Sequence, residues 1–309
     1  MADALPLGGL PHDPVEILRP SFASLVDPAE RVTRLWTGGI WVEGPAWLSH
    51  TGVLVWSDIP NNRMLSWREA DGRIAEFRNP SSGANGNTTD RQGRLVTCEQ
   101  YTRRITRTED DGSITVLADR FEGRRFNAPN DIVEKSDGTI WFTDPDYGRS
   151  PHYEGERELG GCHVYRLDPA TGAIRQMTTD MVMPNGLAFS PDESLLYVVD
   201  TGSTHVQGGP NHVRRFIVGV DDALGGGDIL ATNAAEKFDG FRIDMQSNLW
   251  MGAEDGVHVY DASGLAIGKL HLPARVSNLT FGGSGRDILM MTGTTSIYTC
   301  RVKARPASN

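Results

Sequence analysis

Hydrophobic positions along the chain form short runs, and almost no segment repeats at the spacing of an amphipathic helix. These runs are rich in Val, Ile, Leu, Trp, Tyr and Thr, and turns containing Gly, Asn or Asp separate them. The 35 Gly and 17 Pro are spread over the whole sequence. Short strand-like runs between frequent turns are typical of β-proteins, so the pattern predicts an all-β fold.

A longer repeat is superimposed on these runs. Each unit has a polar residue, usually a small residue, an apolar run, a turn near Asp-Gly and a second apolar run. The units begin at Glu43, Asn85, Asn130, Asn185, Asp239 and Ser277. Their spacings of 42, 45, 55, 54 and 38 residues average about 47, the period of a four-stranded propeller blade. The sequence therefore predicts one six-bladed β-propeller domain over residues 31–309.

The two ends of the repeat predict how the ring closes. The last unit offers three strand runs, near 276–282, 286–292 and 295–302. An open edge there would leave backbone groups unpaired. The β-rich run at 31–36 can fill it, so N- and C-terminal strands are expected to share the last blade. Residues 1–30 are then expected to form a surface arm.

Two long spacings indicate insertions, at 144–161 and 201–211. Both fall between the second and third strands of a blade. If the first strand of each blade starts at one face of the ring, the chain returns to that face at these insertions. Long loops in compact domains are often functional. The sequence therefore predicts a walled pocket over the channel at that face.

The charge balance limits the choice of partners. The chain of 309 residues carries 40 Asp and Glu against 30 Lys and Arg, a formal net charge of −10, with no basic run. This disfavours nucleic acid and anionic membrane surfaces. No apolar stretch approaches the roughly 18 residues of a membrane helix, and no secretory signal is evident.

We expect a cytoplasmic protein, a monomer or weak homo-oligomer. Cys98, Cys162 and Cys300 are expected to be reduced and packed.

The residues that open the six units predict a site at the channel mouth. All six carry a side-chain oxygen, and none is His, Cys, Lys or Arg. Carboxylates and amides arranged in a ring suit a hard divalent cation, which favours calcium over zinc. The competing interpretation is that Asn and Asp at these positions satisfy turn backbone groups by local hydrogen bonds.

Several motifs resemble one known family. They are EGPAW at 43–47, RRFNAPNDIV at 124–133, DGTIWFTDPDYG at 137–148 and PNGLAFSPD at 184–192. Together they are similar to the gluconolactonase, regucalcin (senescence marker protein) and luciferin-regenerating-enzyme family. The resemblance implies a six-bladed propeller that hydrolyses a small lactone with a divalent metal. A sugar lactone such as glucono-1,5-lactone is the expected substrate.

The resemblance also implies residue roles. It assigns one divalent ion, Ca²⁺ before Mg²⁺, Mn²⁺, Zn²⁺ or Fe²⁺, to Glu43, Asn130, Asn185 and Asp239. Asp239 is the expected general base. Asp200 is held in reserve, because it ends a strand at the same face.

Substrate contacts are expected from loops at this face. The family associates the Arg125–Asn127 region with binding of sugar hydroxyls, which suits the planar fork of arginine. On the two insertions, Tyr147 is expected to wall the pocket, and His205 is expected to bind substrate hydroxyls or take part in proton transfer. Less specific candidates for contact with substrate or water are Asn85, Ser277, His152, Tyr153 and His212.

Two alternative functions stay open at this point. One is a phosphotriesterase or arylesterase of the diisopropyl fluorophosphatase or paraoxonase type, which uses a similar propeller-centred calcium. The other is a non-catalytic calcium-binding propeller. The polar pocket edge formed by Arg125, Asn127 and the loop histidines favours a hydroxylated substrate, and the complete ligand set favours catalysis.

Overall fold

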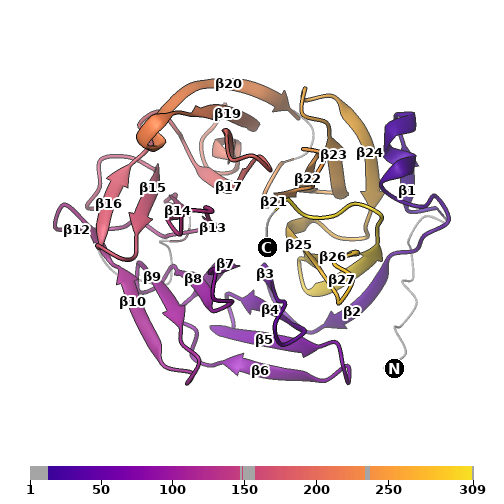
Figure 1. The fold of residues 1–309 in the computed structure, drawn as a ribbon, viewed down its shortest axis with the longest axis horizontal. Coiled ribbons are helices and arrows are strands. Elements are labelled where there is room, and N and C mark those ends of the chain that lie inside the picture. Colours follow the sequence, from indigo (N-terminus) through magenta and orange to yellow (C-terminus); the bar gives the residue numbers. More distant parts are fainter. Residues whose placement is uncertain (1–12, 147, 149–156, 234–236, 308–309) are drawn as a thin grey trace.

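A computed structural model describes residues 13–146, 148, 157–233 and 237–307. Within these residues, six antiparallel sheets are arranged around a central axis and form a closed ring (Figure 1). In each sheet, strands that follow one another in the chain are mostly neighbours. The predicted six-bladed β-propeller is confirmed. No helix in the described part of the chain is long and apolar enough to cross a membrane.

The first three blades are built as the repeat predicted, with the first strand of each blade innermost. Blade 1 contains β3 (Val42–Leu48), β4 (Val53–Asp58), β5 (Arg63–Arg68) and β6 (Ile74–Arg78). Blade 2 contains β7 (Ala84–Thr89), β8 (Leu95–Glu99), β9 (Arg104–Thr108) and β10 (Ile114–Ala118). Blade 3 contains β13 (Ile132–Glu134), β14 (Ile140–Asp144), β15 (His163–Asp168) and β16 (Ala173–Gln176). A small hairpin of β11 (Arg120–Phe121) and β12 (Arg124–Arg125) precedes blade 3.

The other three blades complete the ring. Blade 4 contains β17 (Pro184–Phe189), β18 (Leu195–Asp200), β19 (His212–Val218) and β20 (Leu224–Thr232). Blade 5 contains β21 (Phe241–Ile243), β22 (Leu249–Ala253), β23 (Gly256–Tyr260) and β24 (Ala266–His271). Blade 6 contains β25 (Val276–Gly282), β26 (Ile288–Gly293) and β27 (Ser296–Arg301), with β2 (Thr33–Thr37) outermost. Two 3₁₀ turns, η2 (Gly202–Thr204) and η3 (Val220–Asp222), lie within blade 4.

Ring closure follows the prediction. Strand β2 pairs antiparallel with β27, with Thr33 opposite Thr299. An N-terminal strand thus covers the edge that the C-terminal repeat leaves open, and its backbone groups are paired.

The segment before β2 is more integrated than a surface arm. Strand β1 (Val15–Ile17) pairs with β24 as a fifth strand on blade 5. The 3₁₀ turn η1 (Pro20–Ser24) follows, and Phe22, Leu25 and Val26 are fully or almost fully buried in the core shared by blades 5 and 6. The segment is attached to the propeller by burial of these three apolar side chains and by pairing with the outer edge of blade 5.

The core lies between neighbouring blades. Trp56, Trp141 and Trp250 are completely buried, and Trp47 is 8% exposed, as expected for tryptophans on repeat strands. The three cysteines are free and buried, which confirms the prediction of reduced, packed thiols.

Small residues let the innermost strands approach closely. A Cβ atom on Gly186 would lie 2.7 Å from the backbone oxygen of Asp239, and one on Gly240 would lie 2.2 Å from the amide carbon of Asn278. The glycine that follows the opening residue in four of the six repeats therefore lets neighbouring blades approach closely at the axis. At the far end of the channel, Ala307 donates its N–H to the carbonyl of Ile243, so the C-terminal segment passes beneath the channel.

Candidate metal centre and substrate cavity

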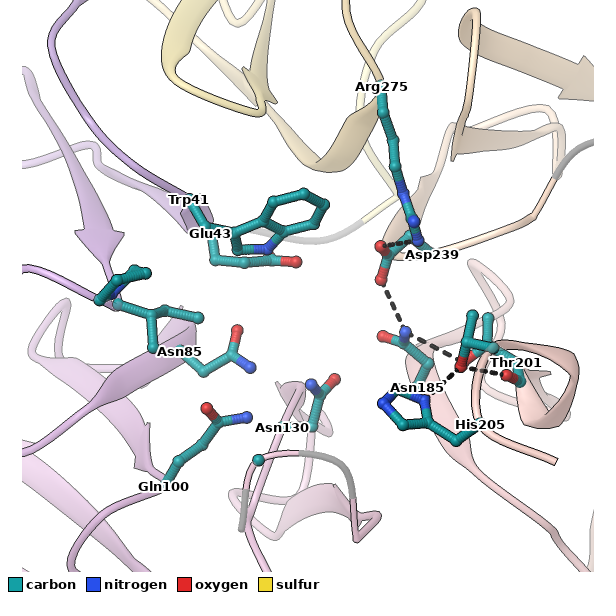
Figure 2. A pocket seen from close by; sticks show the side chains of 14 residues that line it. Trp41, Glu43, Asn85, Gln100, Asn130, Asn185, Thr201, His205, Asp239 and Arg275 are labelled. Atoms are coloured by element: carbon teal, nitrogen blue, oxygen red, sulfur yellow. Dashed lines mark hydrogen bonds and ion pairs between the residues drawn. The ribbon is translucent and has the colours of Figure 1, made fainter. Parts of the chain in front are cut away.

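The face where the innermost strands begin carries a cavity of about 280 Å³. Five of the six residues that open the repeats line it, and Figure 2 shows their side chains pointing toward its centre. The lining is Trp41, Glu43, Ile59, Pro60, Asn85, Gln100, Asn130, Gly148, Asn185, Thr201, Thr204, His205, Asp239 and Arg275. The structure therefore brings together all four predicted metal ligands in one cavity.

Equivalent backbone positions explain this convergence. Glu43 and Asn185 are the second residues of β3 and β17. Asn130 and Asp239 lie two residues before β13 and β21, but their N–H groups donate to Thr143 O at 2.8 Å and Gly252 O at 3.1 Å. All four side chains thus start at the same level of their blades.

A hydrogen-bonded chain links three cavity residues. Asn185 Nδ2 donates to Asp239 Oδ1 at 2.6 Å, and an Arg275 guanidinium nitrogen lies 2.8 Å from Asp239 Oδ2 (Figure 2). The other end of the guanidinium lies 3.3 Å from Glu254, and its carbon lies 5.4 Å from the centre of the Trp41 ring. These contacts fix the orientation of the Asp239 carboxylate.

The two cavity carboxylates resist ionisation. Burial, followed by the charge of Asp239, holds the pKa of Glu43 well above its ordinary value, and the N–H of Gly44 opposes this rise. Burial also raises the pKa of Asp239, while Arg275 and Asn185 oppose the rise. Two buried carboxylates that face one cavity store repulsion that a bound cation would relieve.

A third carboxylate lies next to the ring. Asp131 follows Asn130 in the chain and is 1% exposed. Its charge raises the pKa of both Glu43 and Asp239. Its nearest described cation is Arg242, whose guanidinium nitrogen lies 3.6 Å from Asp131 Oδ2. Asp131 therefore adds a negative charge next to the ring, and Arg242 partly balances that charge.

The donor set fits a hard divalent ion. Glu43 and Asp239 supply carboxylate oxygens, and Asn130 and Asn185 supply neutral amide oxygens, which are the ligand types that calcium accepts. Among the described residues, no group of three or more His, Cys, Asp or Glu side chains is arranged to hold a metal. The cavity therefore depends on its two amides to complete a site.

Asp200, the second candidate for the general base, binds backbone groups of a neighbouring loop. It does not line the cavity, and it is 2% exposed. Its two oxygens accept the backbone N–H groups of Val182 and Met183, both at 2.8 Å. These residues lie just before Asn185, so the carboxylate braces the loop that leads into β17.

The same bracing recurs in blade 3. Asp144 accepts the backbone N–H groups of Asn127 at 2.7 Å and Ala128 at 2.8 Å, just before Asn130. The acidic residue that ends the second strand of these blades thus caps the loop before the ring residue. This agrees with the capping role that turn chemistry assigns to such positions.

Of the predicted substrate-binding residues that the structure describes, one lines the cavity and two do not. His205 lines the cavity, and its Nδ1 lies 2.7 Å from the Thr204 hydroxyl. Arg125 and Asn127 are absent from the lining; Arg125 donates to Thr102 O at 2.9 Å, and Asn127 Nδ2 donates to Gly161 O at 2.9 Å.

The remaining candidates are not in the described lining. Tyr147, His152 and Tyr153 lie outside the described residues. His212 begins β19 and is not in the lining, and the Ser277 hydroxyl donates to Val42 O at 2.7 Å. The polar contacts of Ser277 therefore serve the joint between blades 6 and 1.

Sequence reasoning missed three lining residues with large side chains, Trp41, Gln100 and Arg275. A positional signal existed for two of them. Trp41 and Arg275 each stand two residues before the residue that opens a repeat, and Gln100 directly follows β8. Scanning the position two residues before each repeat would have found Trp41 and Arg275.

Known proteins are similar to this chain over most of its length. The family model described as "SMP-30/Gluconolactonase/LRE-like region" matches residues 41–295. The chain belongs to this family. The resemblance stated from the motifs is therefore confirmed.

Individual members of the SMP-30/gluconolactonase family match over most of their length. A gluconolactonase from Zymomonas mobilis subsp. mobilis is 30% identical over 81% of this chain and 75% of its own. A gluconolactonase structure from Xanthomonas campestris is 36% identical, with a TM-score of 0.87 over 94% of this chain and 95% of its own. A calcium-binding regucalcin from Agrobacterium tumefaciens shares the fold at 20% identity, with a TM-score of 0.73 over 88% and 94%.

Proposed function

We propose that the protein is a divalent-metal-dependent lactonase that opens a sugar lactone such as glucono-1,5-lactone. The observation that carries this proposal is the convergence of Glu43, Asn130, Asn185 and Asp239 on one cavity. The reaction class is also that of the gluconolactonases, which are similar to the chain over most of its length.

Glu43, Asn130, Asn185 and Asp239 would hold the ion, and calcium suits their oxygens best. When bound, such an ion supplies Lewis-acid polarisation of the lactone carbonyl and stabilises the negative charge that develops on it. The two carboxylates balance its charge, and the two amides add none. The ring therefore leaves the ion electrophilic.

Asp239 is the proposed general base. Arg275 and Asn185 hold its carboxylate in one orientation, and burial raises its pKa, which favours accepting a proton at neutral pH. Water adds to the carbonyl carbon as its proton passes to Asp239. The ring C–O bond then breaks, the proton passes to the departing oxygen, and a hydroxy acid leaves.

A calorimetric titration with CaCl₂, followed by a pH-stat assay on glucono-1,5-lactone with and without chelator, tests the proposal. We expect one site per chain and acid release that stops when the metal is removed. Glu43→Gln should weaken metal binding, because it removes one of two ring charges. Glu76→Gln, on the exposed side of β6, is the matched control.

The outcomes separate the alternatives. Metal binding without turnover of any lactone would favour a non-catalytic calcium-binding propeller. Faster turnover of paraoxon than of glucono-1,5-lactone would favour a phosphotriesterase or arylesterase. Unchanged metal binding in Glu43→Gln would contradict the proposed ligand set.

A further inference from the structure

In three of the six blades, the residue that directly follows the second strand lines the cavity. Ile59 follows β4, Gln100 follows β8 and Thr201 follows β18, and all three line the cavity. Ile59 is apolar, and the Thr201 hydroxyl lies 3.3 Å from Asn185 Nδ2. Gln100 places a primary amide at the equivalent position.

The Gln100 residue is mostly covered, and its side-chain amide faces the cavity. The residue is only 4% exposed, yet its side-chain amide has no hydrogen-bond partner among the described residues. Asn85, beside it, is also 4% exposed, and its side-chain amide has no such partner in the same part of the chain. Figure 2 shows both amides on one side of the cavity, across from Asn185, Asp239 and Arg275. Both amides are therefore open to the cavity, where a polar ligand can take their hydrogen bonds.

The fold holds Gln100 in this position. Its backbone N–H donates to Gly83 O at 3.0 Å. The preceding residue, Glu99, is completely buried between Arg78 and Arg104, each 2.5 Å from one of its oxygens. These contacts fix the end of β8 and the backbone from which the Gln100 side chain extends into the cavity.

We propose that Gln100, together with Asn85, forms a subsite that binds the hydroxyl groups of the substrate. An amide offers both donors and an acceptor, which match a hydroxyl group that donates and accepts at once. The inference rests on the proposed function and adds to it which residues bind the hydroxyl groups of the sugar lactone: those groups lie toward blade 2. A lactone without hydroxyls would leave both amides unpaired.

A binding experiment tests the subsite without turnover. D-glucitol, a polyol that cannot be hydrolysed, is titrated calorimetrically into the full chain in calcium buffer. We expect Gln100→Met to weaken glucitol binding about tenfold, because a thioether of similar length cannot replace the amide. Gln246→Met, on an exposed turn, should bind glucitol as the wild type does. Absent glucitol binding in the wild type, or equal binding in Gln100→Met, overturns the subsite.

A second variant perturbs Gln100 without replacing it. A Cβ atom on Gly148 would lie 2.7 Å from the amide carbon and nitrogen of Gln100. Gly148→Ala should displace the amide and weaken glucitol binding in the same direction. If Gln100→Met fails to fold, this variant decides the question.

Kinetics then distinguish the subsite from the proposed function. The ratio of kcat/KM on glucono-1,5-lactone to that on δ-valerolactone should fall about tenfold in Gln100→Met. An unchanged ratio overturns the subsite while leaving the lactonase proposal in place. Glucitol binding that depends on Gln100, in a protein that hydrolyses no lactone, supports the subsite and overturns the lactonase proposal.

Discussion

At the scale of single residues, two similar buried carboxylates have different roles. Asp239 and Asp200 are both almost completely buried near the same face. Asp239 faces the cavity and contacts side chains, whereas Asp200 accepts two backbone N–H groups. The partners of each carboxylate, rather than its burial, indicate which one can react.

Asp239→Asn is expected to lower kcat by at least about a hundredfold, within the range that loss of a general base costs. The fold should survive, since only one carboxylate leaves the ring. Steady-state assays at saturating metal, with calcium content measured in the same samples, check this. Loss of less than tenfold with full metal occupancy would assign the base elsewhere.

Asp200→Asn serves as the structural comparison. An amide NH₂ in place of one oxygen would meet a backbone N–H, which leaves a buried donor unpaired at a cost of about 1–3 kcal/mol. We expect a lower unfolding midpoint and a smaller loss of kcat than in Asp239→Asn. The reverse order would make Asp200 the better candidate base.

Glu134 predicts a pH dependence of stability. Burial raises its pKa from 4.5 to about 7, so the folded protein favours the uncharged form. Its contribution to stability is therefore complete below pH 4.5 and is lost as the pH rises through 7. Glu134→Gln should match the wild type near pH 5 and exceed its stability near pH 8, by about 1 kcal/mol because a half-buried group is partly screened. Urea unfolding at both pH values measures this; an equal gain at each would contradict it.

At the scale of elements, the first strand of each blade connects sequence to site. The repeat predicted the ring because every unit marks the same strand start with an oxygen-bearing residue. Asn130 and Asp239 could be placed in this way although they precede β13 and β21. Gln100 could not, because the direction of a loop side chain depends on contacts from other blades that no local pattern encodes.

The close approach of these strands predicts a sensitive glycine. A Cβ atom at Gly186 would lie 2.7 Å from Asp239 O and 2.9 Å from the Cα of Gly240, and both are backbone atoms. Gly186→Ala should therefore cost about 1–3 kcal/mol of stability and lower activity by shifting Asp239. Gly225→Ala in β20 meets nothing within 4 Å and is the matched control. Denaturant unfolding and kcat of both variants check this, and equal behaviour would contradict the close approach.

At the scale of the whole molecule, the strand pattern predicted the number of blades and the closure by β2. It did not predict that β1 and η1 would join the ring. A three-residue strand carries too little alternation to be recognised, and its pairing partner β24 lies about 250 residues away in the chain. Such long-range pairing is decided by an exposed edge elsewhere in the fold.

This packing predicts that the propeller depends on residues before its first complete blade. Phe22 is completely buried, its ring centre lies 6.0 Å from that of Trp250, and it covers β24 so closely that a Cβ atom on Gly268 would lie 2.0 Å from the Phe22 ring. Phe22→Ala should lower the free energy of unfolding by about 3–5 kcal/mol. The substitution would leave a void between blades 5 and 6, and neither blade can move alone to fill it. Ile17→Ala, at a side chain 38% exposed, should cost about 1 kcal/mol or less.

Chemical denaturation of the two variants, together with a chain that begins at residue 31, measures this dependence. The shortened chain lacks both the fifth strand of blade 5 and the Phe22 contact, so it should be at least as destabilised as Phe22→Ala. If the shortened chain unfolds at the same denaturant concentration as the full chain, residues 31–309 form the independent domain, and the N-terminal segment only lies upon it. A loss confined to the shortened chain would instead assign the stability to pairing of β1 rather than to burial of Phe22.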